Sequence, residues 1–291
     1  MINIAIHVLP HEIDMLEQLL IQLKRNSVHL PKDHGIEVSV CLNTNLVDWN
    51  KSKLPTSFFV NKFDDLDTLT ASWADVNFFT HGKGINGCND IRRDVIRTTD
   101  KPYVMYLDVD NVFGEYFLLN AWSFCKEFGG QAYHVLTPQT TRLWDTTWDC
   151  ITNKYHMDQP ASHEFYDVRD PYEAVMLTST KDRRIRMIPE FKFAGWGTTI
   201  STKLARLIDI PDSLKSYGLD DTFVLYGCYI LREKGHQVNQ YVIENEVIIE
   251  NNFYRTNPYR DLIHSIDRRA EFLANAHANF NPELEKLKLR I

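Results

Sequence analysis

Two acidic side chains, Asp108 and Asp110, lie one residue apart directly after an apolar run in the segment YVMYLDVDNVF. Carboxylates placed in this way at the end of a buried strand could converge on one hard cation. Mg²⁺ and Mn²⁺ prefer oxygen ligands and usually share their coordination shell with the phosphates of a substrate. The same residue types also favour an ordinary bend after a strand. Alone, this motif therefore favours a metal site only slightly.

A second acidic pair, Asp220-Asp221, opens the segment GLDDTFVLYGCYILREKG, whose body is apolar. We predict a helix over 221–234 with Gly235 at its C-terminal end. The helix dipole stabilises carboxylates in the first turn, and a catalytic base located there would be held on a rigid element. A pair of helix-capping residues explains the same pattern, and taken alone the pair is more typical of capping.

Three glycines, Gly82, Gly84 and Gly87, form a GxGxxG pattern between an apolar run and a predicted helix. Asp108 follows Gly87 by 21 residues, a spacing that suits a dinucleotide-binding fingerprint. That fingerprint normally follows the first strand of a domain, whereas here about 75 residues of other elements precede it. A glycine turn that leads into a helix N-terminus also suits any diphosphate.

These motifs require a scaffold in which strands end near one another. Apolar runs predict strands over 2–9, 36–42, 57–60, 76–80 and 103–107, and helical spacing predicts helices over 13–23 and 89–99. Strands that alternate with helices indicate an open, largely parallel sheet with helices on its faces. In such sheets ligands bind beyond the carboxyl ends of the strands, which is where Asp108 and Asp110 lie.

The rest of the chain is less regular. Residues 138–190 are rich in Trp, Tyr, His and Asp and show no long periodic stretch. Regular patterns return over 191–209, the segment HQVNQYVI from 236 predicts a strand, and the charged tail from 258 predicts a helix.

Composition limits the class of protein. The chain has 291 residues, a formal net charge of −7, 44% hydrophobic residues and 24% charged residues. These values exclude a disordered chain and argue against a nucleic-acid partner. No window of about 18 apolar residues exists, so we expect no transmembrane segment. The five cysteines are scattered and form no CxxC motif, which favours reduced thiols and a cytoplasmic location.

Taken in chain order, these pieces resemble the GT-A fold of nucleotide-sugar glycosyltransferases, and glycosyltransferase family 2 in particular. The matching stretches are INIAIHVLP, GCNDIRRDVIRTTDKPYVMYLDVDNVF and FAGWGTTISTKLARLIDIPDSLKSYGLDDTFVLYGCYILREKGHQV. The resemblance implies one α/β domain over 1–257, with a nucleotide-sugar-binding half (1–112) and an acceptor half (113–257). Residues 258–291 would form a helical C-terminal tail.

The resemblance also implies roles for the acidic residues. Asp110 would ligate the metal, and Asp108 would lie beside the ribose or a metal-bound water. Asp221 matches the catalytic base of the family, with Asp220 as its acidic neighbour. Many members supply a further His ligand after the strand that follows the base helix, and here Glu250 or Asn251 stands nearest that place.

Other substrate-binding positions follow from the same resemblance. Asn43 stands where the family often has an Asp that contacts the base or ribose. Arg92 or Arg93 matches a basic residue that faces the donor, and the sequence does not choose between them. Gly195-Trp196 matches the segment that lines the cleft for the donor sugar and the acceptor.

The implied activity is metal-dependent, inverting transfer of a sugar from a nucleoside diphosphate sugar. A UDP-sugar is the favoured donor, and the acceptor would be a hydroxyl of a glycan or a glycoconjugate such as a glycolipid. Mn²⁺ or Mg²⁺ would neutralise the leaving diphosphate, and a base would take the proton of the acceptor hydroxyl. The basic run 181–186 leaves peripheral membrane contact open, although a solvated turn is the simpler explanation.

Three other functions fit parts of the pattern. LDVDNVF also resembles the nucleophile motif of haloacid dehalogenase-like phosphohydrolases, which would use Asp108 and Asp110. The glycine pattern leaves a dinucleotide-dependent oxidoreductase as a third choice. The third alternative is a non-catalytic domain that binds nucleotide sugar or glycan without turnover. The missing His ligand and the Asn at position 43 are the two features that favour it.

Overall fold

The central sheet runs through the whole molecule in the order β3-β2-β1-β4-β9-β6-β10-β5, with β7 added to β6 and β8 to β10. The computed structural model describes residues 1–8, 13–42, 56–80, 88–130, 132–143, 150–151, 175, 178–189, 197–214, 219–251 and 265–291. The strands are β1 (Ile2–Val8), β2 (Ile36–Leu42), β3 (Asp75–Thr80), β4 (Tyr103–Asp108), β5 (Asn111–Phe113), β6 (Tyr133–Leu143), β7 (Cys150–Ile151), β8 (Ile185–Ile188), β9 (Thr199–Ser201) and β10 (Val238–Asn251).

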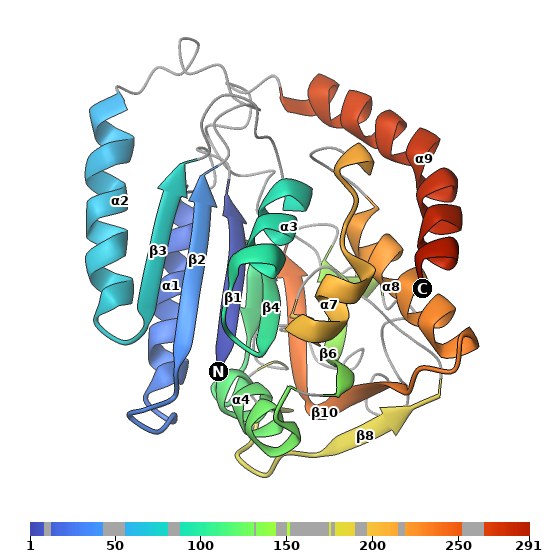
Figure 1. Cartoon of the computed structure of the whole chain (residues 1–291). Coiled ribbons are helices and arrows are strands. Elements are labelled where there is room, and N and C mark those ends of the chain that lie inside the picture. Colours follow the sequence, from blue (N-terminus) through green and yellow to red (C-terminus); the bar gives the residue numbers. More distant parts are fainter. Residues whose placement is uncertain are drawn as a thin grey trace.

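Helices cover both faces of this sheet and its two sides (Figure 1). They are α1 (Ile13–Ser27), α2 (Thr56–Ala71), α3 (Cys88–Thr98), α4 (Phe117–Phe128), α7 (Thr202–Ile208), the short 3-10 helix η3 (Asp212–Leu214), α8 (Asp220–Glu233) and α9 (Ser265–Arg290). Helix α2 lies along the β3 edge, and α9 forms the opposite side of the molecule.

The sheet consists of a parallel block and a mixed block. Strands β3, β2, β1 and β4 are parallel to one another, which confirms the predicted α/β class. Strand β9 then runs antiparallel to both β4 and β6, and β6 is parallel to β10. All the parallel strands of the first block therefore end on one edge, where β4 places Asp108.

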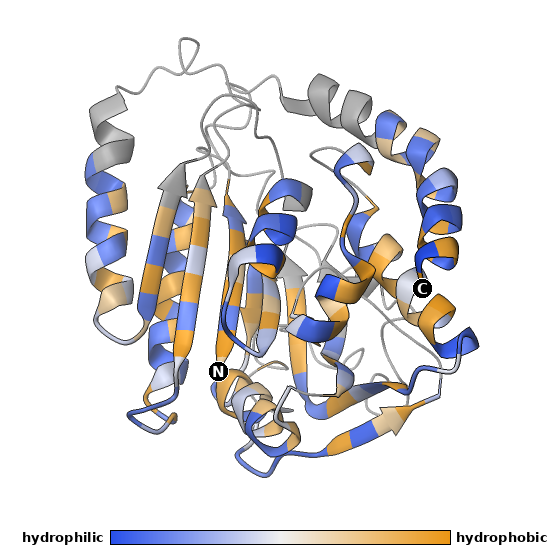
Figure 2. Cartoon of the chain, in the orientation of Figure 1, coloured by the Kyte–Doolittle hydropathy of each residue, from blue (hydrophilic) through white to orange (hydrophobic). Residues whose placement is uncertain are grey.

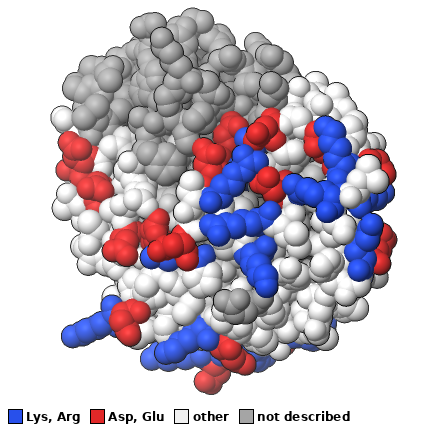
Figure 3. Space-filling view, viewed as in Figure 1, with Lys and Arg blue, Asp and Glu red and all other residues white. Residues whose placement is uncertain are grey.

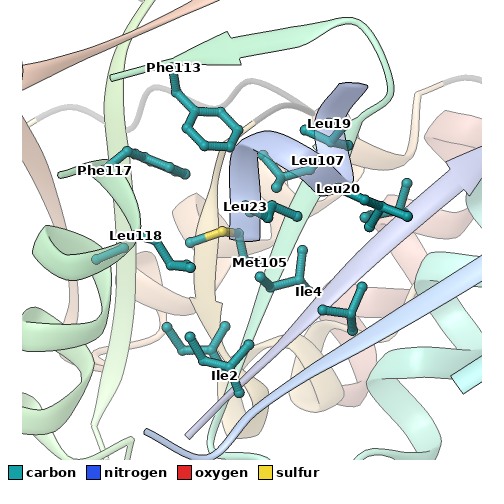
Figure 4. Close-up of a cluster of buried hydrophobic side chains, with 14 of the residues drawn as sticks. Ile2, Ile4, Leu19, Leu20, Leu23, Met105, Leu107, Phe113, Phe117 and Leu118 are labelled. Carbon is teal, nitrogen blue, oxygen red and sulfur yellow. The ribbon is translucent and has the colours of Figure 1, made fainter. Parts of the chain in front are cut away.

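Alternation along the strands divides the apolar core into two layers. On one face, Ile2, Ile4 and Ile6 of β1 pack with apolar residues of α1 and α4 (Figure 4). On the other face, Val104 and Tyr106 of β4 pack with apolar residues of α3, α7 and α8. In Figure 2 the strands are mostly hydrophobic, whereas the helices carry hydrophilic residues as well. Side chains of β4 pack in both layers, and this packing fixes the residues at the end of the strand.

Most predicted elements are present, and one is wrong. The predicted strand over 57–60 is part of α2. A short apolar run does not distinguish a strand from a helix. The apolar pattern continues at helical spacing to Leu66, which lies on the buried face of α2. The long strands β6 and β10 pair with each other over most of their lengths, a pairing that local sequence patterns do not reveal.

The C-terminal helix packs against the rest of the chain. Ala276, Leu284 and Leu287 of α9 are buried in the second core layer. Phe280 meets Phe223 and Tyr226 of α8 edge-on, with ring centroids 6.0 and 5.8 Å apart. Among the described residues, no helix has the length and the apolar character needed to cross a bilayer.

A buried carboxyl group, Glu246, lies in a bulge of β10. The pairing of β10 with β6 shifts register between Ile243 and Val247, which turns Glu246 into the interior, where it is 0% exposed. The Asn120 amide and the Ser179 hydroxyl donate hydrogen bonds to its Oε1 atom, at 2.5 and 3.0 Å. Burial raises the pKa of Glu246 to about 8, so this group is protonated in the folded protein at neutral pH.

Stability should therefore fall as pH rises from about 4.5 to about 8. In that interval the folded chain keeps the Glu246 proton that the unfolded chain has lost, so folding takes up a proton. The Glu246→Gln variant cannot lose this proton, so it should gain stability relative to the wild type at pH 8 by on the order of 3 kcal/mol compared with pH 5.

Urea unfolding at pH 5, 6.5 and 8 measures this difference. Glu244→Gln is the matched control, because Glu244 lies on the same strand and its side chain is 37% exposed beside Arg186. If the free energy of unfolding changes with pH in the same way for the wild type and for Glu246→Gln, Glu246 is ionised in the folded protein and the prediction is wrong.

Candidate active site

The turn after β4 holds the first two predicted site residues. Asp108 ends the strand, and Asp110 lies in the short connection to β5. The Asn111 side chain closes this turn, because its Oδ1 atom accepts a hydrogen bond from the Asp108 amide at 3.0 Å and its Nδ2 atom donates to Asp110 at 3.4 Å. Asp110 is buried, whereas the Asp108 side chain is 34% exposed. The turn thus fixes one carboxylate inside the protein and leaves the other accessible to a ligand.

Arg92 on α3 connects this turn to the second acidic pair. Its guanidinium donates to Asp220 Oδ2 at 2.5 Å and to Asp108 Oδ1 at 3.1 Å. Both Arg92 and Asp220 are buried, so their ion pair is shielded from solvent and strengthened by the low local dielectric. One arginine thereby joins the end of β4 to the first turn of α8.

The Tyr106 ring packs against the guanidinium of Arg92. The Arg92 guanidinium carbon lies 5.0 Å from the centroid of the Tyr106 ring, a distance at which a cation is attracted to the ring face. Tyr106 is two residues before Asp108 on β4, so both side chains are on the same face of the sheet. Its buried hydroxyl has no hydrogen-bond partner among the described residues, and burial raises the pKa of Tyr106 above its usual range.

Asp221 has the electrostatic environment of a base. It lies in the first turn of α8, where the Thr222 amide and hydroxyl donate to its Oδ1 atom at 2.6 and 3.2 Å. Burial raises the pKa of Asp221 to about 6, repulsion from Asp220 contributes to the rise, and Arg92 opposes it. A carboxylate with a pKa near the working pH is well suited to accept a proton.

The backbone that leads into this acidic pair is strained. Leu219 precedes Asp220 with φ at 62°, in the left-handed region, and its side chain makes no capping hydrogen bond. For a residue with a β-carbon this conformation costs on the order of 1 kcal/mol or more. Such strain is concentrated at functional sites, so the entry to α8 is consistent with a built binding site.

The second arginine of the predicted pair points elsewhere. Arg93 donates to Asp90 at 2.8 Å and to the carbonyl oxygens of Ile210 and Pro211 at 2.9 and 3.0 Å. These contacts hold α3 against the connection between α7 and η3. Consecutive residues of a helix diverge by about 100°, and Arg92 is the arginine that pairs with Asp108 and Asp220.

The remaining predicted residues are less completely described. Asn43, Gly195 and Trp196 lie outside the described residues, as does the glycine pattern over 82–87. The backbone of Glu250 pairs with Asn111 across β10 and β5, which brings this position to the turn with Asp108 and Asp110. Its side chain is outside the described part of the chain.

The donor set for a cation consists of carboxylates. Within the described ranges, no three His, Cys, Asp or Glu side chains converge closely enough to form a metal cage. Magnesium-type ions commonly use only one or two carboxylates and complete their shell with water and substrate phosphates. Asp108 and Asp110, held on one closed turn, fit such an open site and do not fit a closed structural one.

Three residues of this site were not predicted from the sequence: Tyr106, Asn111 and Thr222. A signal existed for two of them. Asn111 directly follows the acidic motif, in a position where Asn favours a turn, and Tyr106 shares the strand face of Asp108 at i, i+2 spacing. The role of Thr222 depends on the orientation of Asp221, for which the sequence carries no signal.

Comparison with known proteins gives structural similarity only. No protein-family model and no curated protein matches this sequence. The crystal structure of S. aureus TarS residues 1-349 matches 95% of this chain and 70% of its own, with a TM-score of 0.51 and 15% identity. The same TarS fragment in complex with UDP-GlcNAc matches 95% of this chain and 72% of its own, with a TM-score of 0.51 and 13% identity.

A second kind of protein matches over a shorter part of its length. The structure of GalNAc-T7 with UDP, GalNAc and Mn²⁺ matches 86% of this chain and 43% of its own, with a TM-score of 0.51 and 9% identity. At such low identities these similarities establish the fold. The chain has the GT-A fold of glycosyltransferases, as predicted.

Proposed function

We propose that this protein transfers a sugar from a nucleoside diphosphate sugar to a hydroxyl of a glycan or glycoconjugate, with inversion at the anomeric carbon. The observation that carries the proposal is the pair of hydrogen bonds that Arg92 donates to Asp108 and to Asp220, which we call the Arg92 bridge. The next residue, Asp221, is a carboxyl group whose pKa is raised to about 6. UDP is the favoured nucleotide, because structures of the same fold contain UDP or UDP-GlcNAc.

In the proposed reaction Asp221 acts as the general base. Its carboxylate takes the proton of the acceptor hydroxyl while that oxygen attacks the anomeric carbon. The bond between this carbon and the diphosphate oxygen breaks on the opposite side, and the nucleoside diphosphate leaves. Asp220, paired with Arg92, positions the first turn of α8.

Asp108 and Asp110 would hold Mn²⁺ or Mg²⁺, with Glu250 as a further candidate ligand from the neighbouring strand. The cation would supply positive charge to the leaving diphosphate. Asn43, Gly195 and Trp196 remain predicted donor- and acceptor-binding residues. The division into a donor half (1–112) and an acceptor half (113–257) remains a prediction as well.

Calorimetric titration of UDP and of GDP, each with and without Mn²⁺, tests the donor site. We expect one nucleotide to bind only with Mn²⁺, and we expect Asp110→Ala to lose at least tenfold in affinity, about 1.4 kcal/mol. Asp182→Ala is the control, because Asp182 is an exposed carboxylate elsewhere on the surface.

The two main outcomes separate the candidate functions. Metal-dependent binding of one nucleotide that Asp110→Ala abolishes would support the donor site and identify the nucleobase of the donor. Absence of binding by either nucleotide, together with phosphate release from a generic phosphoester, would replace the transferase by the phosphohydrolase that uses Asp108 and Asp110.

A further inference from the structure

The buried carboxyl group of Glu246 lies where three segments meet. They are the bulge of β10, helix α4 and residues 178–184, which lead into β8 and which we call the β8 leader. Asn120 of α4 and Ser179 of the leader both donate to Oε1 of Glu246, and its Oε2 atom has no hydrogen-bond partner among the described residues. Because both donors share one oxygen, the proton of the neutral carboxyl group belongs on Oε2.

The bulge also fastens the β8 leader through Asn245. The Nδ2 atom of Asn245 donates to the carbonyl and hydroxyl oxygens of Thr180 at 3.1 and 3.0 Å, and its Oδ1 atom accepts a hydrogen bond from the Arg184 amide at 2.8 Å. Asn120 donates to the Thr180 carbonyl oxygen as well, at 2.9 Å. Side chains of the bulge and of α4 thus hold the leader together.

A further set of contacts connects the β8 leader to the acidic turn (108–111). The Ser179 hydroxyl oxygen accepts a hydrogen bond from the Tyr116 amide at 2.9 Å, directly before α4. Gly114 lies so close to Ser179 that a β-carbon at this glycine would clash with the serine side chain. Gly114 follows β5, and β5 begins with Asn111, whose side chain closes the turn. Ser179 therefore supports the end of β5 that lies away from the turn.

Strand β10 reaches the same turn by a second route. Residues 244–246 are inserted in β10 between its two stretches of pairing with β6. Beyond this bulge β10 pairs with β5, with Glu250 opposite Asn111. The bulge therefore sets which residue of β10 lies beside the acidic turn, and Glu246 takes part in both routes.

Among the described residues, Glu246 has no cationic partner, and no charged group contributes to its raised pKa. In contrast, most Lys and Arg side chains on the face shown in Figure 3 lie beside Asp or Glu side chains. The titratable side chains described on the surrounding segments are paired elsewhere, exposed or neutral. Arg183 pairs with Glu127, Arg186 with Glu244 and His29 with Glu115; Lys126 and Lys181 lie over the rings of Trp122 and Tyr116; Asp182 and Arg184 are exposed; Cys125 and His134 are buried, which raises the pKa of the thiol and lowers that of the imidazole.

Loss of the Glu246 proton would place an unpaired negative charge inside this junction. Oε2 would become a buried anionic oxygen without a donor, and burial of an unpaired charge is costly. The chain lowers this cost if water reaches the bulge and separates Glu246 from Ser179 and Asn120. The same contacts support β5, so the acidic turn would lose that support.

We propose that Glu246 is a positioning residue for the donor site: its neutral carboxyl group holds β5 and the acidic turn in place, and ionisation of this group releases them. The effect on nucleotide binding rests on the proposed function, whereas the effect on β5 and the β8 leader does not. Donor binding should weaken as pH rises through the pKa of Glu246, about 8.

Calorimetric titration of UDP with Mg²⁺, at pH 7 and at pH 9, measures this weakening. About nine tenths of the folded chains carry the Glu246 proton at pH 7 and about one tenth at pH 9, so the apparent affinity of the wild type should fall about tenfold. Glu246→Gln keeps the acceptor oxygen and cannot ionise, so its affinity should change far less. Glu244→Gln, which alters an exposed carboxylate of the same bulge, should follow the wild type.

Glu246→Met is a second variant that cannot ionise. It lacks the acceptor for Asn120 and Ser179, so it should bind UDP more weakly than the wild type at pH 7, with little further change at pH 9. A residue that only fills space would leave the ratio of the two affinities unchanged. The same ratio in the wild type, Glu246→Gln and Glu246→Met would overturn the proposal.

Hydrogen–deuterium exchange measures the release without a nucleotide. At pH 9 the amides of 111–118 and of the β8 leader should exchange several-fold faster in the wild type than in Glu246→Gln, and this difference should exceed the one in β1. Comparison at one pH removes the intrinsic effect of pH on exchange. Faster exchange without UDP binding at either pH would support the role of Glu246 and count against the proposed donor site. Equal exchange at pH 9 would overturn the role of Glu246.

Discussion

Replacing Asp221 by Asn should reduce kcat for sugar transfer by about 10²- to 10⁴-fold, the usual contribution of a general base. The amide keeps the size of the side chain and cannot take the acceptor proton. The nucleotide should still bind with little change, because the proposed donor ligands, Asp108 and Asp110, are on a different turn. Release of nucleoside diphosphate from the donor that binds, with and without glycan acceptors, measures the effect.

The pH profile provides a second measure of the same group. Because burial holds the pKa of Asp221 near 6, kcat should rise as pH increases through about 6, where the base loses its proton. The residual activity of Asp221→Asn should lack this rise. Unchanged turnover in the variant would remove Asp221 from the mechanism, and absence of acceptor-dependent release in the wild type would favour a domain that binds without turnover.

Replacing Arg92 by Leu should lower the free energy of unfolding by about 3–5 kcal/mol, because it leaves the buried carboxylate of Asp220 without its partner. Asp108 loses a partner too, but its side chain is 34% exposed and can be solvated. Urea unfolding at neutral pH measures the loss. The double variant Arg92→Leu/Asp220→Leu should recover much of it, since no buried charge then remains unpaired.

Arg97→Leu is the matched control on the same helix. Arg97 pairs with Asp209 and Asp212 at the surface, and its side chain is 40% exposed. Exposed pairs of this kind contribute about 0–1 kcal/mol, so its loss should be small. Equal losses for Arg92→Leu and Arg97→Leu would mean that the Arg92 bridge is solvated rather than buried.

Local patterns predicted the elements of the parallel block well. β1, β2 and β4 are short apolar runs, and α3 and α8 each begin one residue before the predicted position. The strand predicted over 57–60 is wrong because a segment of four residues is too short to show a helical or strand period. The choice between Arg92 and Arg93 was not possible, because it depends on how α3 is rotated against the sheet.

Features that arise from distant contacts had no sequence signal. The insertion of β9 between β4 and β6 and the bulge that buries Glu246 depend on pairing between segments far apart in the chain. Such features depend on packing between distant segments, whereas apolar runs and helix caps depend only on neighbouring residues.

The three residues of β9 also determine the order in which this chain can assemble. Ile200 pairs with Val104 on one side and Val135 on the other, so the strand is inserted only after long loops have closed, and loop closure is what slows folding. The β1–β4 block, with its short-range connections, can form earlier. The acidic turn would then exist before α8 brings Asp220 to Arg92. A nascent chain would therefore form its proposed nucleotide-binding half before its proposed catalytic base.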